Sequence, residues 1–235
     1  DEHLDRFYRS AAMLDIRIPH EKQELRAIIL DMVRRVDSGE QFVYLQATRG
    51  TQPRDHVYPE DMHANIWIML RPQTVKDVFH EVRAITAEDT RFFHNNIKTL
   101  NLIPSVIAYQ RCIEQGCQET VFHRGERVTE CAHSNILIIK DGVLCTPPRD
   151  NLILPGITLK HLLMLAEKNG IPTSEAPFTM QELADADEII VSSSGGLCIQ
   201  AVELDGKPIG GKDPKTLKTL QDAYAEFYAE DTKVR

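Results

Sequence analysis

Residues 127–146 read RVTECAHSNILIIKDGVLCT, and this stretch decides the fold class of the chain. It contains three short runs that have the length and the β-branched content of strands. These runs cover 127–130, 135–139 and 143–146. Asp141-Gly142, between the last two runs, favours a two-residue hairpin because both residue types tolerate a positive φ. The stretch therefore predicts a group of short strands connected by tight turns.

Further strands and helices alternate on both sides of this stretch. Strands are expected at 82–87, 119–123, 188–193 and 197–204, and helices at 104–114, 158–168, from 180 onward and from 214 onward. Thr179 with Glu182 forms a capping box for the third of these helices. Asp213 before Pro214 supplies an N-cap and a first helical residue for the fourth.

A smaller part precedes the strand-rich part. Helices are expected at 2–14 and from about 20 to 36, and strands at 42–48 and 64–70. We interpret residues 71–73, Arg-Pro-Gln, as a linker. The chain is therefore predicted to be α+β, with a small α/β N-terminal domain, residues 1–72, and a larger strand-rich C-terminal domain, residues 73–235.

Charge and cysteine content argue against several classes of partner. The 35 acidic residues outnumber the 27 basic ones, the formal net charge is −8, and no long basic run suggests nucleic-acid binding. Five scattered cysteines form no C-x-x-C pair, so we expect no disulfide framework, no metal site and a cytoplasmic location. No apolar run is long enough to suggest a membrane partner. Because the chain begins at Asp1 instead of Met, we expect its natural start to lie upstream.

Lys98 and Glu130 are candidates for chemistry. A lysine is most often a solvated surface residue, but Lys98 lies between apolar Ile97 and Leu100. Partial burial would make its amine a usable nucleophile. Glu130 ends an expected strand and precedes the small and polar residues 131–135, which resemble the lining of a site. A carboxylate on the solvated rim of the sheet is the alternative for Glu130.

Two segments could bind an anion. Gly156-Ile157-Thr158 opens an expected helix, whose free N–H groups and dipole form a natural seat for phosphate. The alternative is that Thr158 is simply the N-cap of that helix. The segment 192–196, Ser-Ser-Ser-Gly-Gly, could add hydroxyl and backbone donors, or it could be an ordinary turn.

Arg54 and His56 are candidates for binding a carboxylate. They are two residues apart, and in extended backbone residues at this spacing point to the same side. Both side chains could then bind one carboxylate. A solvated loop is the alternative.

Taken together, these segments resemble the fold-type IV family of pyridoxal-phosphate enzymes, and within it most closely the D-amino acid transaminases. The resemblance extends over almost the whole chain. Its most specific stretches are Ala47–His56, Ile97–Leu102, Val128–Glu130 with Ser134-Asn135, Leu152–Thr158 and Ser192–Ser194. The Arg-x-His pair is the main indication of the D-amino acid branch. The resemblance implies that the larger domain is a strand-rich pseudo-barrel that binds pyridoxal 5'-phosphate.

Roles at the cofactor follow from this resemblance. Lys98 would hold the cofactor through a Schiff base and, when displaced by the substrate, carry the proton at the α-carbon. Glu130 would pair with the pyridine nitrogen and keep it protonated, and Leu154 would pack against the ring. The residues implied to bind the phosphate are Arg6, Ile157, Thr158 and Ser194.

The resemblance also implies the substrates and the assembly. The activity would be transfer of an amino group between D-amino acids, such as D-alanine, and 2-oxo acids. Arg54 and His56 would bind the α-carboxylate of the substrate from the neighbouring subunit, which implies a homodimer.

The sequence departs from the family pattern in three places. The family's N-terminal segment, which brings an aromatic hydroxyl to the carboxylate site, is absent before Asp1. Residues 131–133, Cys-Ala-His, stand where related sequences have small residues and serines, and Gly195-Gly196 is smaller than expected. These departures bear on substrate range, with His133 able to alter hydrogen bonds in the site.

Three other functions stay open from the sequence. A branched-chain L-amino acid transaminase and an aminodeoxychorismate lyase share the lysine, the glutamate and the phosphate arginine, but neither accounts for Arg54 with His56. An inactive homologue that acts as a binding subunit is the alternative from another class.

Overall fold

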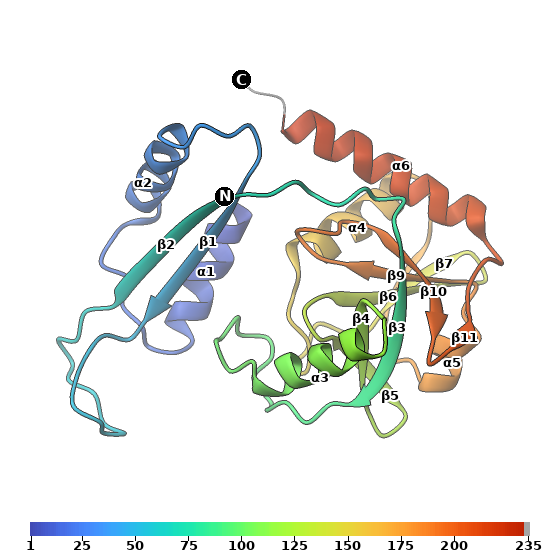
Figure 1. The fold of residues 1–235 in the computed structure, drawn as a ribbon, viewed down its shortest axis with the longest axis horizontal. Helices are drawn as coiled ribbons and strands as arrows, with labels where there is room; N and C mark the ends of the chain where they lie inside the picture. The colour runs from blue at the N-terminus through green and yellow to red at the C-terminus, as the bar shows by residue number, and fades with distance from the viewer. Residues whose placement is uncertain (233–235) are drawn as a thin grey trace. The chain divides into compact units, whose positions relative to one another are not determined.

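The computed structural model describes residues 1–232 and divides into two compact units, Asp1–Thr74 and the chain from Val75 onward (Figure 1). Each unit contains both helices and strands. Within the described residues, no helix combines the length and the apolar character needed to cross a bilayer.

The first unit consists of two helices and two paired strands. Its elements are α1 (Glu2–Ala12), α2 (Lys22–Arg34), β1 (Gln41–Thr48) and β2 (Asn65–Pro72). The interpretation of residues 71–73 as a linker is wrong in part, because Arg71 and Pro72 belong to β2 and lie opposite Phe42 and Gln41 of β1. A proline is tolerated there because β2 is an edge strand, which does not need every N–H for pairing.

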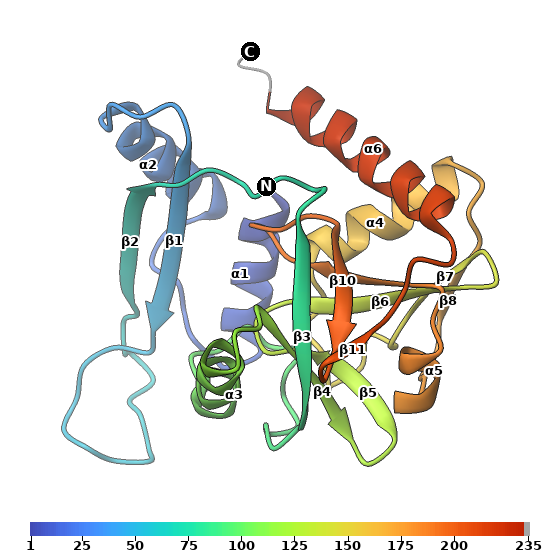
Figure 2. The same ribbon diagram turned by 45° about the vertical axis from the view of Figure 1, so that its right-hand side comes forward.

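The second unit is built on one mixed sheet of nine strands. They are β3 (Glu81–Glu88), β4 (Glu119–Arg124), β5 (Arg127–Cys131), β6 (Asn135–Lys140), β7 (Val143–Thr146), β8 (Thr173–Glu175), β9 (Glu188–Ser192), β10 (Ile199–Leu204) and β11 (Lys207–Pro208). Their order is β5-β4-β3-β10-β9-β6-β7-β8, with β11 paired to β10. β3 is parallel to β4 and β10, whereas β9 is antiparallel to β10 and β6. The sheet curls into a half-barrel, as Figure 2 shows.

Four helices accompany this sheet. They are α3 (Ile103–Glu114), α4 (Ile157–Lys168), α5 (Met180–Ala184) and α6 (Pro214–Asp231). α4 and α6 pack against each other and share one apolar core with the sheet, which contains Leu162 and Leu217. A second core contains Leu183 of α5.

Burial of both faces of the sheet explains the apolar composition of its central strands. In β6, Ile136 and Ile138 belong to the core with α5, and the alternating Leu137 and Ile139 belong to the core with α4 and α6. A strand covered on both faces has a continuous apolar run instead of an alternating one. This is the pattern of residues 135–139.

Local signals in the sequence placed several ends of elements correctly. Thr179 and Glu182 form the expected capping box of α5, and the Asp213 side chain caps α6 by accepting from Thr216 N. Asp141 and Gly142 both have positive φ in the turn between β6 and β7. β8 was not expected, because its sequence, Thr-Ser-Glu, has no apolar pattern.

Several of the candidate residues of the second unit lie at one end of the sheet. β5 ends at Cys131 and β6 begins at Asn135, so that Glu130 and Asn135 lie on either side of a short turn. Asn135 lies directly opposite Ser192, the last residue of β9. The start of α4 is close to the same place, because Asn135 donates to the carbonyl of Leu154 (2.8 Å).

Candidate active site

Glu130 is a buried carboxylate, 5% exposed, which accepts hydrogen bonds from three donors. Its Oε1 accepts from Arg91 Nη1 at 2.5 Å. Its Oε2 accepts from Asn135 Nδ2 at 3.1 Å and from Leu154 N at 3.0 Å. Three donors on one carboxylate favour its ionised form, because a protonated acid would replace one acceptor site with a donor. The interpretation of Glu130 as a solvated rim residue is therefore wrong.

The burial of Glu130 and the charge of Arg91 act on it in opposite directions. Burial raises the pKa of Glu130 to about 7, although the charge and hydrogen bond of Arg91 and the Leu154 N–H act to lower it. The carboxylate is therefore poised between its two protonation states near neutral pH. A further positive charge beside it would favour the ionised state.

Arg91 and Asp89 belong to this site, and the sequence analysis did not identify them. Arg91 is buried and binds Asp89 in a bidentate manner, through Nε to Oδ1 and Nη2 to Oδ2, both at 2.9 Å. Thr129 Oγ1 donates to the same Asp89 (2.9 Å). The only feature of the sequence that could have indicated them is that Asp89 and Arg91, of opposite charge, lie two positions apart after an apolar strand. Their pairing with Glu130, 39 residues away, could not be inferred from spacing.

Lys98 lies on the same loop as Arg91, between β3 and α3. The loop is fastened beside the candidate site, because Asn95 N donates to Asn151 O (3.0 Å) and Asn95 Nδ2 donates to Leu152 O (3.2 Å). Ile97 is buried, whereas the Lys98 side chain is exposed rather than partly buried. A solvent-accessible amine on an anchored loop can be reached by a small molecule.

The start of α4 has the features of an anion-binding site. Gly156 is the N-cap and no side chain caps this helix, so the alternative that Thr158 is the N-cap is wrong. Thr158 is instead a buried residue of the first turn. A Cβ atom at Gly156 would lie 2.1 Å from Asn135 Oδ1, so only glycine allows this approach. The uncapped N–H groups of the first turn can bind an anion.

The serine segment after β9 lies on the other side of Asn135. Ser192 is 1% exposed, and its Oγ has no hydrogen-bond partner within the described part of the chain. A buried hydroxyl without a partner is uncommon in a folded protein and suggests that a bound group completes its hydrogen bonding. Ser194, the serine expected to contact phosphate, is exposed in the following turn. From the sequence, Ser192 was a candidate only as part of the segment 192–196, and Ser194 was the serine expected at the phosphate.

The remaining candidates lie in the first unit. Arg6 is a buried residue of α1, and burial, followed by the charge of Arg9, lowers its pKa. Arg54 and His56 are exposed in the loop between β1 and β2. This loop is not extended at the pair, because the backbone bends at residues 53, 54 and 56, and Asp55 Oδ1 accepts a hydrogen bond from His56 N (2.6 Å). The extended spacing expected for Arg54 and His56 is therefore wrong, although both side chains are accessible.

His133, the departure in the turn after β5, has a partner of its own. Its Nδ1 is 3.3 Å from Glu119 Oε2, and its ring packs edge-on against Tyr109. Ser134 Oγ donates to the same carboxylate at 2.6 Å. Glu119 therefore holds the turn between Glu130 and Asn135 in place.

The residues of the second unit fit a phosphate-bearing pyridine cofactor. Glu130 supplies a buried acid or base, and Oε1 accepts only one hydrogen bond from the residues 1–232. The start of α4 and the Ser192 hydroxyl supply donors for an oxyanion. Across residues 1–232, no group of three or more His, Cys, Asp or Glu could hold a metal ion.

Comparisons with known proteins identify the family of this chain. The model of the class IV aminotransferase family matches residues 1–204. D-alanine aminotransferase of Listeria monocytogenes serotype 4b (strain F2365) is 42% identical over 228 residues, covering 94% of this chain and 79% of that protein. D-alanine aminotransferase of Staphylococcus haemolyticus is 34% identical over 230 residues, covering 96% and 82%.

A solved structure shows the same fold. The branched-chain amino acid aminotransferase of Thermobaculum terrenum, in its PLP-bound form, superposes with a TM-score of 0.87 at 22% identity, covering 96% of this chain and 76% of that one. The family match spans far more than half of the sequence, and both D-alanine aminotransferases exceed 30% identity. This chain belongs to the class IV aminotransferase family, whose members use pyridoxal phosphate.

Proposed function

We propose that this protein transfers amino groups between D-amino acids, D-alanine among them, and 2-oxo acids. The observation that carries the proposal is the buried Glu130 carboxylate, held by three donors beside an uncapped helix start. The D-amino acid preference is supported by the relatives named D-alanine aminotransferase, at 34–42% identity over nearly the whole chain.

Each residue would have a separate task around the cofactor. When bound, pyridoxal phosphate supplies an aromatic ring that accepts electrons from the substrate α-carbon. Glu130 would hold a proton on the ring nitrogen, because an ionised carboxylate stabilises a cationic ring. Lys98 would hold the cofactor and, once displaced by the substrate, carry the proton at the α-carbon. Leu154, which donates its N–H to Glu130, would pack against the ring.

The phosphate would bind at the start of α4. Ile157 and Thr158 offer backbone N–H groups, and the helix dipole favours the negative charge there. Ser192 and Ser194 add hydroxyl donors. The guanidinium of Arg6 would supply the charge-assisted contact that a doubly charged phosphate needs.

Arg54 and His56 would bind the α-carboxylate of the substrate, and the neighbouring subunit would supply them in a homodimer. The assembly is supported by a group of exposed apolar residues that covers the segment before α3 and its outer face. This surface contains Leu100, Leu102, Ile103, Val106 and Ile107, of which Ile103 is 75% exposed. An exposed apolar group of this kind is typical of a protein interface.

Amino-donor preference tests the proposed function. We expect the purified protein, loaded with pyridoxal phosphate, to transfer the amino group of D-alanine to 2-oxoglutarate much faster than that of L-leucine. Product formation is measured with each donor and with aminodeoxychorismate. Reaction with L-leucine and none with D-alanine would establish a branched-chain enzyme instead, and reaction with aminodeoxychorismate alone would establish a lyase. A protein that reacts with none of them would be a binding homologue.

Arg54→Ala is expected to weaken substrate binding more than turnover. Loss of a charge-assisted contact to a carboxylate costs about 1.5–3 kcal/mol, so KM for D-alanine should rise by roughly 10–150-fold while kcat changes little. Arg34→Ala, which removes an exposed arginine of α2 in the same unit, is the matched control and should leave KM unchanged. An unaltered KM in Arg54→Ala would exclude Arg54 from the carboxylate site.

A further inference from the structure

Arg91 connects Glu130 to a second buried carboxylate. Its guanidinium donates from Nη1 to Glu130 Oε1 (2.5 Å), and from Nε and Nη2 to the two oxygens of Asp89. A fourth hydrogen bond runs from Nη2 to Leu152 O at 3.3 Å. Both side chains of the Arg91–Glu130 pair are only 7% exposed. Asp89, Arg91 and Glu130 therefore form one buried group of hydrogen-bonded charges.

We propose that Arg91 is a positioning residue that keeps Glu130 ionised and oriented toward the cofactor ring, and that Asp89 fixes the Arg91 guanidinium for this purpose. The inference rests on the proposed function, because it concerns the same carboxylate. Arg91 would thus affect the reaction through Glu130, without touching the substrate.

The hydrogen bonds of Glu130 leave one place for the ring nitrogen. A carboxylate can accept about four hydrogen bonds, two at each oxygen. Oε2 accepts two, from Asn135 and Leu154, and Oε1 accepts one, from Arg91. The open acceptor position is therefore on the oxygen that Arg91 holds. A shift of the Arg91 guanidinium would move this oxygen or leave it without its charged donor.

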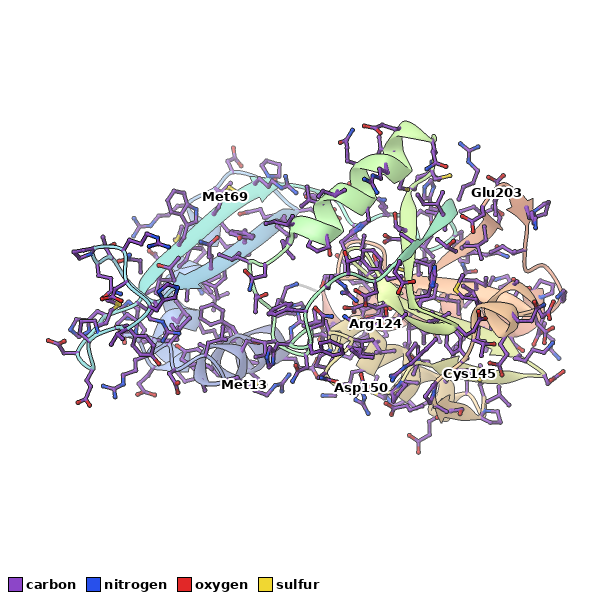
Figure 3. The ribbon with its side chains drawn as sticks, turned by 90° about the horizontal axis from the view of Figure 1, so that it is seen from below. Met13, Met69, Arg124, Cys145, Asp150 and Glu203 are labelled. Atoms are coloured by element: carbon purple, nitrogen blue, oxygen red, sulfur yellow. The ribbon has the colours of Figure 1, made fainter. Side chains whose placement is uncertain are left out.

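The charges around Glu130 show why Arg91 is needed. The loop after β3 contributes Asp89 and Arg91, and β4 contributes Arg124, labelled in Figure 3, whose Nε is 3.4 Å from Asp89 Oδ2. Cys131 of β5 is buried and its pKa is raised by burial, so it stays neutral. β6 and the segment before α4 add only the neutral donors of Asn135 and Leu154.

Arg91 is consequently the cation that directly contacts Glu130 within residues 1–232. The charge of Asp89 raises the pKa of Glu130, after burial, and Arg124 lies close enough to Asp89 to offset part of that charge. The pKa of Asp89 is lowered despite burial, because Arg91 binds it by charge and by hydrogen bonds. Asp89 is therefore ionised and anchors the guanidinium, rather than competing for the proton of Glu130.

An arginine suits this place better than a lysine. The planar guanidinium group of Arg91 binds both oxygens of Asp89 and still directs Nη1 to Glu130. The ammonium group of a lysine is a point charge without this fixed geometry. The Arg91 guanidinium also lies over the Phe122 ring, 4.8 Å from its centroid, which keeps it in one plane. Arg91→Lys is therefore expected to retain charge and lose orientation.

The test compares Arg91→Met and Arg91→Lys with the wild-type protein. An arginine beside a carboxylate lowers its pKa by about 1–3 units, so the Glu130 pKa should rise by about 1–3 units in Arg91→Met and by less in Arg91→Lys. The pKa is measured by NMR on the cofactor-free chain labelled with ¹³C at the glutamate carboxyls. Glu130→Gln identifies the signal.

Kinetics provide the second measurement. In the loaded enzyme, kcat with D-alanine should fall by about 10–100-fold in Arg91→Met at neutral pH, with little change in KM. The acidic limb of its pH profile should move upward by the same 1–3 units, so that raising the pH restores part of the rate. Arg83→Met, which removes an exposed arginine of β3, is the control and should change neither measurement.

The outcomes separate this inference from the proposed function. A wild-type protein that does not transaminate, but whose Glu130 pKa rises in both Arg91 variants, would refute the function and retain the link between Arg91 and Glu130. An active wild-type protein whose Glu130 pKa and pH profile stay unchanged in Arg91→Lys and Arg91→Met would overturn the positioning role. If Arg91→Met does not fold, the test rests on Arg91→Lys. A wild-type pH profile of the Arg91→Lys enzyme would then show that the guanidinium geometry of Arg91 is not needed to position Glu130.

Discussion

Lys98→Ala is expected to abolish transamination, lowering kcat with D-alanine by at least about 10³-fold. The amine would provide both the attachment of the cofactor and the proton transfer at the α-carbon, and a positioned general base alone contributes about 10²–10⁴-fold. The methyl side chain of alanine can perform neither task. Initial rates with D-alanine and 2-oxoglutarate measure the loss. The fold should persist, because the Lys98 side chain is exposed and its loop is held by Asn95.

Lys207→Ala is the matched control for this experiment. Lys207 is an exposed lysine of β11 in the same unit, and its removal should leave the rate unchanged. Borohydride reduction of the wild-type protein, followed by peptide mass analysis, should place the cofactor label on Lys98. Label on another lysine, or normal turnover by Lys98→Ala, would disprove the assignment and with it the proposed site.

Glu130→Gln is expected to lower kcat by about 10²–10³-fold while the protein still binds the cofactor. The amide cannot supply the negative charge that stabilises a protonated ring nitrogen, and losing one preorganised electrostatic contact in a site costs a factor of this size. The phosphate contacts at α4 do not depend on Glu130, so cofactor affinity should change much less. Single-turnover rates and a cofactor titration separate the two effects.

Glu188→Gln serves as the control for removing a buried carboxylate. Glu188 begins β9, at the opposite end of that strand from Ser192, and accepts hydrogen bonds from Gly211 N and Asp213 N. Its loss should lower stability without lowering kcat per folded molecule. Equal rate losses in Glu130→Gln and Glu188→Gln would show that Glu130 acts only through stability.

The pH dependence of stability gives a further check on Glu130. Its pKa in the folded chain is about 7, above the ordinary value of 4.5, so the folded state binds the proton more tightly. The tighter proton binding increases the free energy of unfolding below pH 4.5, and this increase is lost as the pH rises through 7. Wild-type stability should therefore fall relative to Glu130→Gln across this window, by up to about 3 kcal/mol. Urea unfolding of the cofactor-free proteins measures it.

Some features of the candidate site were local enough to be predicted. The helix beginning near residue 157 and the strand that contains Glu130 were predicted from short local patterns and their boundaries. Gly156 was predicted to lie at the start of that helix, and the alternative that Thr158 is its N-cap is wrong, because Gly156 is the N-cap. The choice depends on Asn135 Oδ1, which occupies the space where a side chain at 156 would lie.

Other features arise only when distant segments meet. Arg91 reaches Glu130 because β3, β4 and β5 are adjacent in the sheet, which brings the loop after β3 to the end of β5. No periodicity in the sequence reports a contact across 39 residues. The bends at residues 53, 54 and 56 likewise differ from the extended backbone expected for Arg54 and His56.

The sequence by itself determined the strands of residues 127–146, the Asp141-Gly142 turn and the caps at Thr179 and Asp213, because these depend on side chains and backbone a few residues apart. The tertiary structure alone decided the burial of Glu130 and the donors that hold it. Burial and hydrogen bonding of a charge depend on every segment packed around it, and those segments become neighbours only in the folded sheet.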